Sequence, residues 1–129
     1  MGLSTKRNDA MVDVKTPMRA PWGDIAPRLT EISNNVLFDD VWRRPGLSPR
    51  DRSLITVASL IALYRSNDLK FHLGKALENG VTRDEIIEMI THLAFYSGCT
   101  ASTAIGIARE VFAATQEPTQ SKGASNANA

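Results

Sequence analysis

The chain has 129 residues, of which 43% are hydrophobic and 22% are charged, and its formal net charge is +1. This composition supports one globular domain, and the balanced charge argues against a nucleic-acid or membrane-surface partner. No apolar run reaches the roughly 18 residues of a membrane span, and no segment resembles a signal peptide. Cys99 is the only cysteine, so an intramolecular disulfide is impossible. We therefore expect a cytoplasmic protein.

The two ends of the chain differ in composition from the middle. Residues 1–20 are polar and unpatterned, and residues 117–129 are of low complexity. We expect both to be disordered tails around one domain, residues 21–116. No segment of that domain alternates with the period of a strand, so we expect an all-α fold of about five to six helices.

The first predicted helices are separated by a clear break. Apolar residues recur at helical spacing over 27–41, which predicts the first helix. The stretch RRPGL, residues 43–47, ends it through its Pro-Gly pair. Ser48 is then a good N-cap, and Asp51 favours the positive end of the next helix. That helix, residues 50–64, is apolar on nearly all sides, which indicates burial against other subunits.

Three further helices are predicted in the second half. A short break at residues 66–68 opens a helix that runs to Glu78, where Asn79-Gly80 provides a left-handed end. The stretch TRDE, residues 82–85, is a capping box that starts a helix to about residue 97. Gly98 interrupts the pattern, and a last helix covers about 100–114.

His72 is the first candidate functional residue. It shares a helix face with Leu69, Leu73 and Ala76, so the pattern alone also allows a core histidine satisfied by a backbone carbonyl. Arg52 is the second candidate. A guanidinium in the first turn of a helix is unfavourable by itself, so we expect it to meet an anion or a carboxylate there, or an acidic residue in an ion pair.

Two other positions allow more than one interpretation. His92 follows Glu88 by four residues and precedes Tyr96 by four, so the three share a polar edge. A metal site would need a further ligand, and a contact on the surface or between subunits is the better interpretation. Cys99 stands among small residues, which favours close helix packing over a nucleophile.

Three stretches together resemble the carboxymuconolactone decarboxylase family. They are WRRPGLSPRDRSLITVASLIAL at 42–63, HLGKALENGVTRDEI at 72–86 and HLAFYSGCTAS at 92–102. The likeness extends over about residues 22–115. It implies an all-α fold, a homo-oligomer that is usually a ring-shaped hexamer built as a trimer of dimers, and sites at or near subunit interfaces.

The resemblance separates two chemical branches. The branch similar to alkylhydroperoxidase D uses a glutamate, a CxxC pair and a histidine. If His72 is that histidine, the glutamate falls on Ser53 and the cysteines fall on Arg65 and Asp68. Without two thiols a dithiol cannot cycle, so peroxidase activity is disfavoured. The decarboxylase branch keeps an RPGL segment, an Arg-Ser pair and the histidine, as this chain does, but often has a further histidine near Ala104.

The resemblance to the decarboxylase branch implies a cofactor-free carboxy-lyase acting on a small carboxylated lactone in aromatic-acid catabolism. No metal or organic cofactor is expected. We expect His72 to be the general acid, Arg52 and Arg44 to bind carboxylates and Ser53 to donate to the substrate. His92 and Tyr96 are further substrate-binding candidates, contributed by this chain or by an adjacent subunit. A peroxidase and a non-catalytic oligomer that binds a small molecule are the alternatives.

Overall fold

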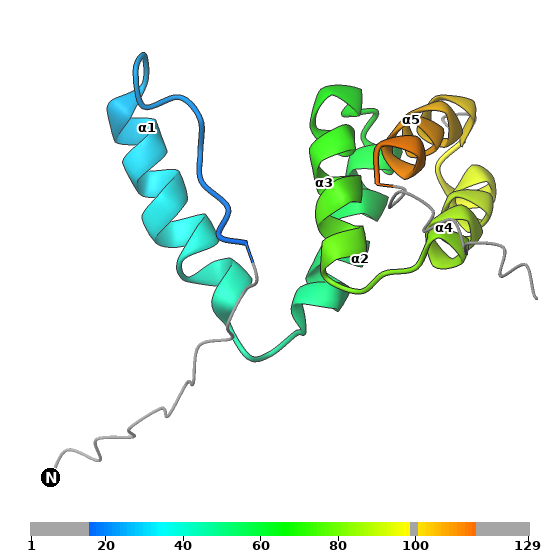
Figure 1. Ribbon diagram of the computed structural model, residues 1–129, viewed down its shortest axis with the longest axis horizontal. Helices are drawn as coiled ribbons and strands as arrows, with labels where there is room; N and C mark the ends of the chain where they lie inside the picture. The colour runs from blue at the N-terminus through cyan, green and yellow to red at the C-terminus, as the bar shows by residue number, and fades with distance from the viewer. Residues whose placement is uncertain (1–15, 99–100, 116–129) are drawn as a thin grey trace, which may run out of the picture.

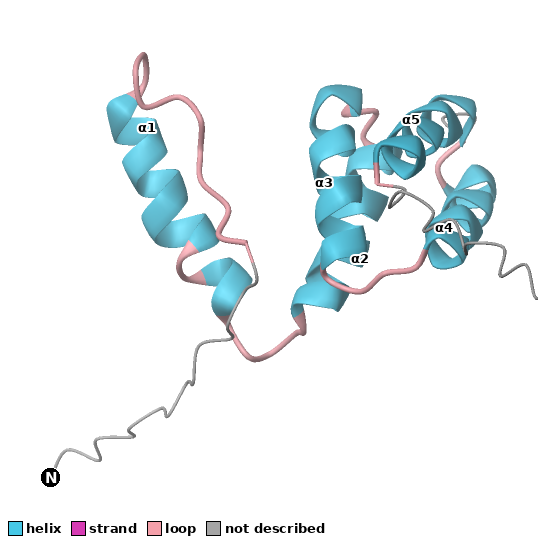
Figure 2. Ribbon diagram, viewed as in Figure 1, coloured by secondary structure: helices cyan, strands magenta, loops and turns pink. Residues whose placement is uncertain are grey.

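A computed structural model describes residues 16–98 and 101–115 of the chain. Its elements are α1 Pro27–Ile32, the π-helix η1 Ser33–Phe38, the 3₁₀ helix η2 Val41–Arg43, α2 Pro49–Ala62, α3 Ser66–Glu78, α4 Arg83–Tyr96 and α5 Ala101–Ala114. Every regular element in these two ranges is helical, which confirms the all-α prediction (Figure 2). Among the same residues, no helix is both long and apolar enough to cross a membrane.

Residues 22–38, which contain α1 and η1, form an arm that stands to one side of the α2–α5 group (Figure 1). The expected single helix over 27–41 widens after Ile32 into a π-helical turn, in which the Asp39 N–H donates to the Asn34 carbonyl at 2.8 Å. This i→i+5 bond ends the regular helix, and Val41 begins a separate 3₁₀ turn. Such π-turns are frequent near functional sites.

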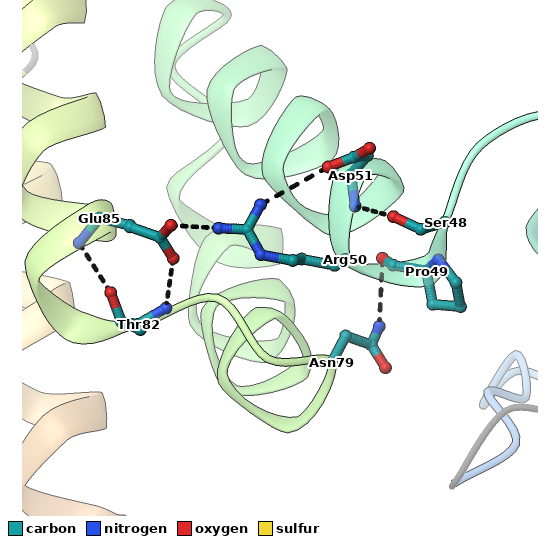
Figure 3. Close-up of polar contacts among 7 residues, drawn as sticks. All are labelled: Ser48, Pro49, Arg50, Asp51, Asn79, Thr82 and Glu85. Atoms are coloured by element: carbon teal, nitrogen blue, oxygen red, sulfur yellow. Dashed lines mark hydrogen bonds and ion pairs between the residues drawn. The ribbon is translucent and has the colours of Figure 1, made fainter.

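The helix starts are those that the capping residues predict. The Ser48 hydroxyl accepts the Asp51 N–H at 3.0 Å, and Pro49 occupies the first turn of α2. Thr82 and Glu85 exchange two hydrogen bonds of 2.9 and 3.1 Å in a complete capping box (Figure 3). Both caps satisfy backbone N–H groups that a helix start leaves free.

The same region joins α2 to the two helices that follow it. The Arg50 guanidinium donates to the Glu85 carboxylate of α4, and Asn79, after α3, donates to the Pro49 carbonyl at 3.5 Å (Figure 3). The Thr82 N–H and then Arg50 hold the pKa of Glu85 below its ordinary value. These contacts set the ends of α2, α3 and α4 against one another.

The hydrophobic core lies among α2, α3, α4 and α5. Its fully or nearly fully buried members are Val57, Ile61, Leu69, Leu73, Ala76, Val81, Ile86, Ile90, Ala104, Ala108 and Val111. Burial of such side chains stabilises the fold by about 25 cal/mol per Å² of apolar surface. On α2 only the face with Val57 and Ile61 is buried within the chain, while Ile55 is 51% and Leu63 is 70% exposed. Subunit contacts remain a prediction for those exposed positions.

Left-handed residues end three of the helices. Gly80 and Gly98 have φ values of +97° and +83°, as expected of glycines after a helix. The turn between α2 and α3 instead uses Tyr64, with φ of +59°. Residues 66–68, expected as the break itself, form the first turn of α3. The break therefore falls at residues 63–65.

The segment before the arm packs against the helices. Met18 and Ala20 are buried, and the Ala20 N–H donates to the Asn34 side chain at 2.8 Å. Arg19 pairs with Asp39 at 2.6 Å, and the Lys75 ammonium of α3 donates to the Thr16 carbonyl. The expected tail over 1–20 therefore needs correction at residues 16–20, which make specific contacts. The rest of that tail, the tail over 117–129 and Cys99 lie outside the described residues.

Candidate active site around His72 and Arg52

His72 lies on α3 between two aromatic side chains. The Trp42 ring is stacked on the imidazole with centroids 6.1 Å apart and planes 13° apart, and Phe71 meets it edge-on at 5.1 Å. The Nδ1 atom is buried and has no hydrogen-bond partner among the described residues. A core histidine would be expected to bond a backbone carbonyl through this nitrogen, and no carbonyl of the described residues does so. Burial lowers the pKa of His72 below 6.5, and the Asp68 carboxylate partly opposes this shift.

Arg52 lies in the first turn of α2 and is half-buried. Its Nη2 donates to the Arg44 carbonyl at 2.9 Å, while its Nε is buried without a partner among the described residues. No carboxylate in the described part of the chain forms an ion pair with it. A buried donor left without a partner costs about 1–3 kcal/mol, so a water, an ion, a ligand or another molecule is expected to accept from this nitrogen.

Two hollows meet at Arg52. The larger, about 480 Å³, is lined by Arg44, Pro45, Gly46, Leu47 and Arg52. The smaller, about 180 Å³, is lined by Leu37, Val41, Trp42, Arg52, Ile55 and Thr56. Trp42 thus faces both the Arg52 hollow and His72, and it joins the two candidate groups. Sequence reasoning did not select Trp42, although a large aromatic residue directly before RRPGL was a usable signal.

Ser53 lines neither of these two hollows. It is 1% exposed on the core face of α2, and the Asn79 side chain donates to its hydroxyl at 2.9 Å. A residue so enclosed cannot reach a substrate unless the helices separate. Within the single chain Ser53 makes a structural contact, in which it holds the turn after α3 against α2, and its role as a substrate donor stays a prediction.

His92 and Tyr96 stand together on α4, away from the two hollows. Their rings are stacked with centroids 4.7 Å apart and planes 22° apart, and both residues are exposed. Neither of them lines the two hollows at Arg52, and the ring contacts of His72 among the described residues are with Trp42 and Phe71. The single chain therefore gathers Arg44, Arg52 and His72 but leaves this aromatic pair outside.

Arg65 and Asp68 occupy the positions where the peroxidase branch would carry cysteines. They form an exposed ion pair at 3.5 Å at the start of α3. The Asp68 carboxylate also raises the pKa of His72 against the effect of burial. The surroundings of His72 are thus ionic and aromatic, and no sulfur chemistry is available at these two positions.

Comparison with known proteins extends this description. The model of the Carboxymuconolactone decarboxylase family matches residues 27–110. The chain is similar to 4-carboxymuconolactone decarboxylase of Acinetobacter baylyi, with 49% identity over 76 residues that cover 58% of this chain and 57% of that protein. It is also similar to nitrosuccinic acid decarboxylase npaB of Metarhizium robertsii, with 43% identity over 68 residues that cover 53% and 48%.

The aligned part amounts to about half the length of each of these curated relatives. The family match is broader, since it includes every element from α1 into α5. It also includes Trp42, Arg44, Arg52 and His72. The chain therefore belongs to the carboxymuconolactone decarboxylase family.

Proposed function

We propose that this chain is a cofactor-free decarboxylase that acts on a small carboxylated lactone, in the manner of 4-carboxymuconolactone decarboxylase in aromatic-acid catabolism. The observation that carries the proposal is a pair of buried nitrogens, Arg52 Nε and His72 Nδ1, which have no partner in the described part of the chain and which both lie beside Trp42. The relatives support the reaction type, because both are named as decarboxylases. A cytoplasmic location follows from the same proposal.

The reaction needs little from the protein beyond binding and one proton. When the bond to the departing carboxylate breaks, CO₂ leaves and the electron pair moves through the ring double bond to the lactone carbonyl oxygen. The resulting enolate then takes a proton at carbon, and the carbonyl forms again. Because the substrate accepts its own electron pair, the site must hold the carboxylates, stabilise the enolate oxygen and supply the proton.

Arg52 and Arg44 suit the binding step. The larger hollow lies between them, and a guanidinium can bind a carboxylate through two parallel hydrogen bonds. The Arg44 carbonyl already orients the Arg52 side chain through the 2.9 Å hydrogen bond. The unpartnered Nε leaves Arg52 with a further donor for the same anion. The two arginines would thus fix the substrate by its charged groups.

His72 suits the proton-transfer step. Burial keeps its pKa below 6.5 in the free protein, so the imidazole is mostly neutral near neutral pH. An anionic substrate bound beside it favours the imidazolium and raises this pKa. Binding would therefore load His72 with the proton that it delivers to the enolate.

Assembly belongs to the same proposal. We infer a homo-oligomer, a hexamer built as a trimer of dimers, in which His92 and Tyr96 complete the substrate pocket of an adjacent subunit. The support is that this pair is exposed and stands outside the site of its own chain. A stripe of exposed apolar residues on the arm, Ile25, Leu29, Ile32 and Val36, provides a surface for subunit contact.

The test is release of CO₂ from 4-carboxymuconolactone by the purified protein and by its His72→Asn variant. Loss of a general acid lowers the rate by about 10² to 10⁴, with the helical circular dichroism unchanged. The matched control is Lys70→Gln on the same helix, where the exposed pair with Glu110 at 3.6 Å contributes little. Parental turnover by His72→Asn would refute the assignment of the acid.

The second candidate substrate is nitrosuccinate, favoured by the similarity to the Metarhizium robertsii protein. It also carries two carboxylates for the arginines and a nitro group that can accept the electron pair. The assay therefore includes it beside the lactone. Tight binding of such acids without CO₂ release would favour a non-catalytic binding oligomer. Thiol-dependent peroxide consumption would favour the peroxidase alternative.

A further inference from the structure

Trp42 is the residue through which the arm reaches the candidate site. It is 6% exposed and lies in η2, between the π-helical end of the arm and the start of α2. Its ring lies nearly parallel to the imidazole of His72, although thirty residues separate the two in sequence. Stacked aromatic pairs with ring centroids roughly 4.5–7 Å apart attract each other beyond the area that they bury.

The other aromatic neighbour cannot serve in the same way. Phe71 is the residue next to His72 on the same helix, α3, and is 56% exposed, so it cannot fix the imidazole relative to another element. Trp42 comes from a different element and is itself enclosed. It is therefore the contact that can fix the plane of the imidazole relative to the rest of the site.

The backbone next to Trp42 holds the second candidate group. Arg44 follows it by two residues, and the Arg44 carbonyl accepts the Arg52 Nη2 at 2.9 Å. The Trp42 side chain also lines the smaller hollow together with Arg52. One short segment, residues 42–44, thus sets the position of both His72 and Arg52.

We propose that Trp42 is a positioning residue for His72: its indole stacks on the imidazole, fixes the plane of the ring and keeps water from its buried edge. This inference rests on the proposed function for its catalytic consequence, but the contact itself is testable without substrate. Other charged groups surround the pair, namely Asp68 on α3, Arg52 on α2, Arg43 on η2, and Arg19 and Asp39 beside η2. A test must therefore separate the effect of the indole from theirs.

The first measurement is the pKa of His72 by NMR. The chain has only two histidines, so His92→Asn assigns their ring signals. In Trp42→Leu, water reaches the imidazole and we expect its pKa to rise toward 6.5, while Trp42→Phe keeps a flat ring and stays near the parental value. Trp22→Leu is the matched control, since Trp22 is the other tryptophan and is 45% exposed on the arm. An unmoved or lowered pKa in a folded Trp42→Leu protein overturns the inference.

A second measurement leaves Trp42 in place, so it stays decisive if Trp42→Leu does not fold. With Trp22→Phe, Trp42 is the only tryptophan, and an imidazolium quenches indole fluorescence more strongly than a neutral imidazole. We expect emission to fall on acidification with the midpoint of His72, and this step to vanish when His72→Asn is added. A step that persists without His72 counts against the contact.

Steady-state kinetics of the Trp42 variants connect the stacking contact to the proposed reaction. Loss of a positioning contact lowers kcat by roughly 10- to 100-fold with little change in KM, and Trp42→Phe restores most of it. If the parent decarboxylates but Trp42→Leu moves neither kcat nor the pKa of His72, only the Trp42 role fails. If the pKa moves but the parent releases no CO₂ from either substrate, only the proposed function fails.

Discussion

At the scale of single residues, the site is defined by polar atoms that the chain leaves unsatisfied. Arg52 Nε and His72 Nδ1 are buried and find no partner in residues 16–98 and 101–115, whereas Ser53, next to Arg52, accepts a hydrogen bond from Asn79. An unmade hydrogen bond of a buried group is costly, so Arg52 and His72 are open to a ligand, whereas the Ser53 hydroxyl already has a partner. The two neighbours Arg52 and Ser53 on α2 therefore differ, because Arg52 has a donor left free by these residues and Ser53 has a structural contact.

Arg52→Lys tests whether the guanidinium geometry matters. Lysine keeps the charge but loses the planar pair of donors and the bond to the Arg44 carbonyl. Loss of one charge-assisted hydrogen bond of about 1.5–3 kcal/mol raises KM roughly 10- to 150-fold. Steady-state kinetics measure this change. Arg28→Lys, in an exposed pair with Glu31 on the arm, is the control and should keep the parental KM. Equal KM values for the two variants would remove Arg52 from the binding site.

The buried imidazole of His72 also makes stability depend on pH. Its pKa is lowered on folding, so below 6.5 the unfolded chain binds more protons than the folded chain. The contribution of His72 to the free energy of unfolding is fully present above pH 6.5, and it is lost as the pH falls through the folded-state pKa. Urea unfolding at about pH 7.5 and about pH 5.5 should show a smaller loss for His72→Asn than for the parent. A larger loss in the variant would mean that folding raises the pKa of His72 and does not lower it.

At the scale of elements, local signals account for where helices start and stop. Ser48 and Thr82 accept backbone N–H groups at the two predicted starts, and Gly80 closes α3 with a positive φ. These interactions involve residues within four positions of one another, so they can be inferred from the chain alone. The π-turn of η1 had no such local signal, since its Asn34 is held by the Ala20 N–H from fourteen residues away.

Two glycines of the α3 region should respond oppositely to alanine. An added Cβ meets nothing within 4 Å at either Gly74 or Gly80, so only backbone conformation differs. Gly80→Ala forces alanine to φ of +97° and should destabilise by about 1–2 kcal/mol. Gly74→Ala lies inside α3 and should stabilise by about 0.5–1 kcal/mol. Chemical denaturation measures both. Equal shifts for the two variants would contradict the left-handed cap.

At the scale of the whole molecule, many large apolar side chains of the described residues are exposed. The arm carries Ile25 at 82% and Leu29 at 54% exposure, and Phe95 on α4 is 86% exposed. Exposed apolar side chains that gather on one face mark contact with another molecule. A second copy of the chain is the occupant that the proposed assembly requires.

Charge on the arm should therefore dissociate the oligomer. Leu29→Glu with Ile32→Glu places two carboxylates in the exposed stripe and should shift the mass in light scattering to that of a smaller assembly. Asn35→Glu adds a charge at an exposed polar position of η1 and is the control. A parental protein that is monomeric, or an unchanged mass in the double variant, would exclude the arm as the subunit contact.

The sequence indicated some residues of the candidate site and not others, for a physical reason. His72 and Arg52 were selected because unusual residue types stood on patterned helices, and the structure leaves both with buried unpartnered nitrogens. The enclosure of Ser53 could not be predicted, because sequence order does not say which face of α2 meets α3. Trp42 was not selected because its contact with His72 joins residues thirty positions apart.

By itself, the sequence determined the helices, their caps, the absence of paired thiols and the family motifs. Each of these depends on composition or on residues a few positions apart. Only the tertiary structure decided that Ser53 is enclosed, that Tyr64 turns the chain into α3 and that Trp42 covers His72. These depend on how the faces of separate helices pack, because burial and stacking are properties of contacts between elements rather than of any one element.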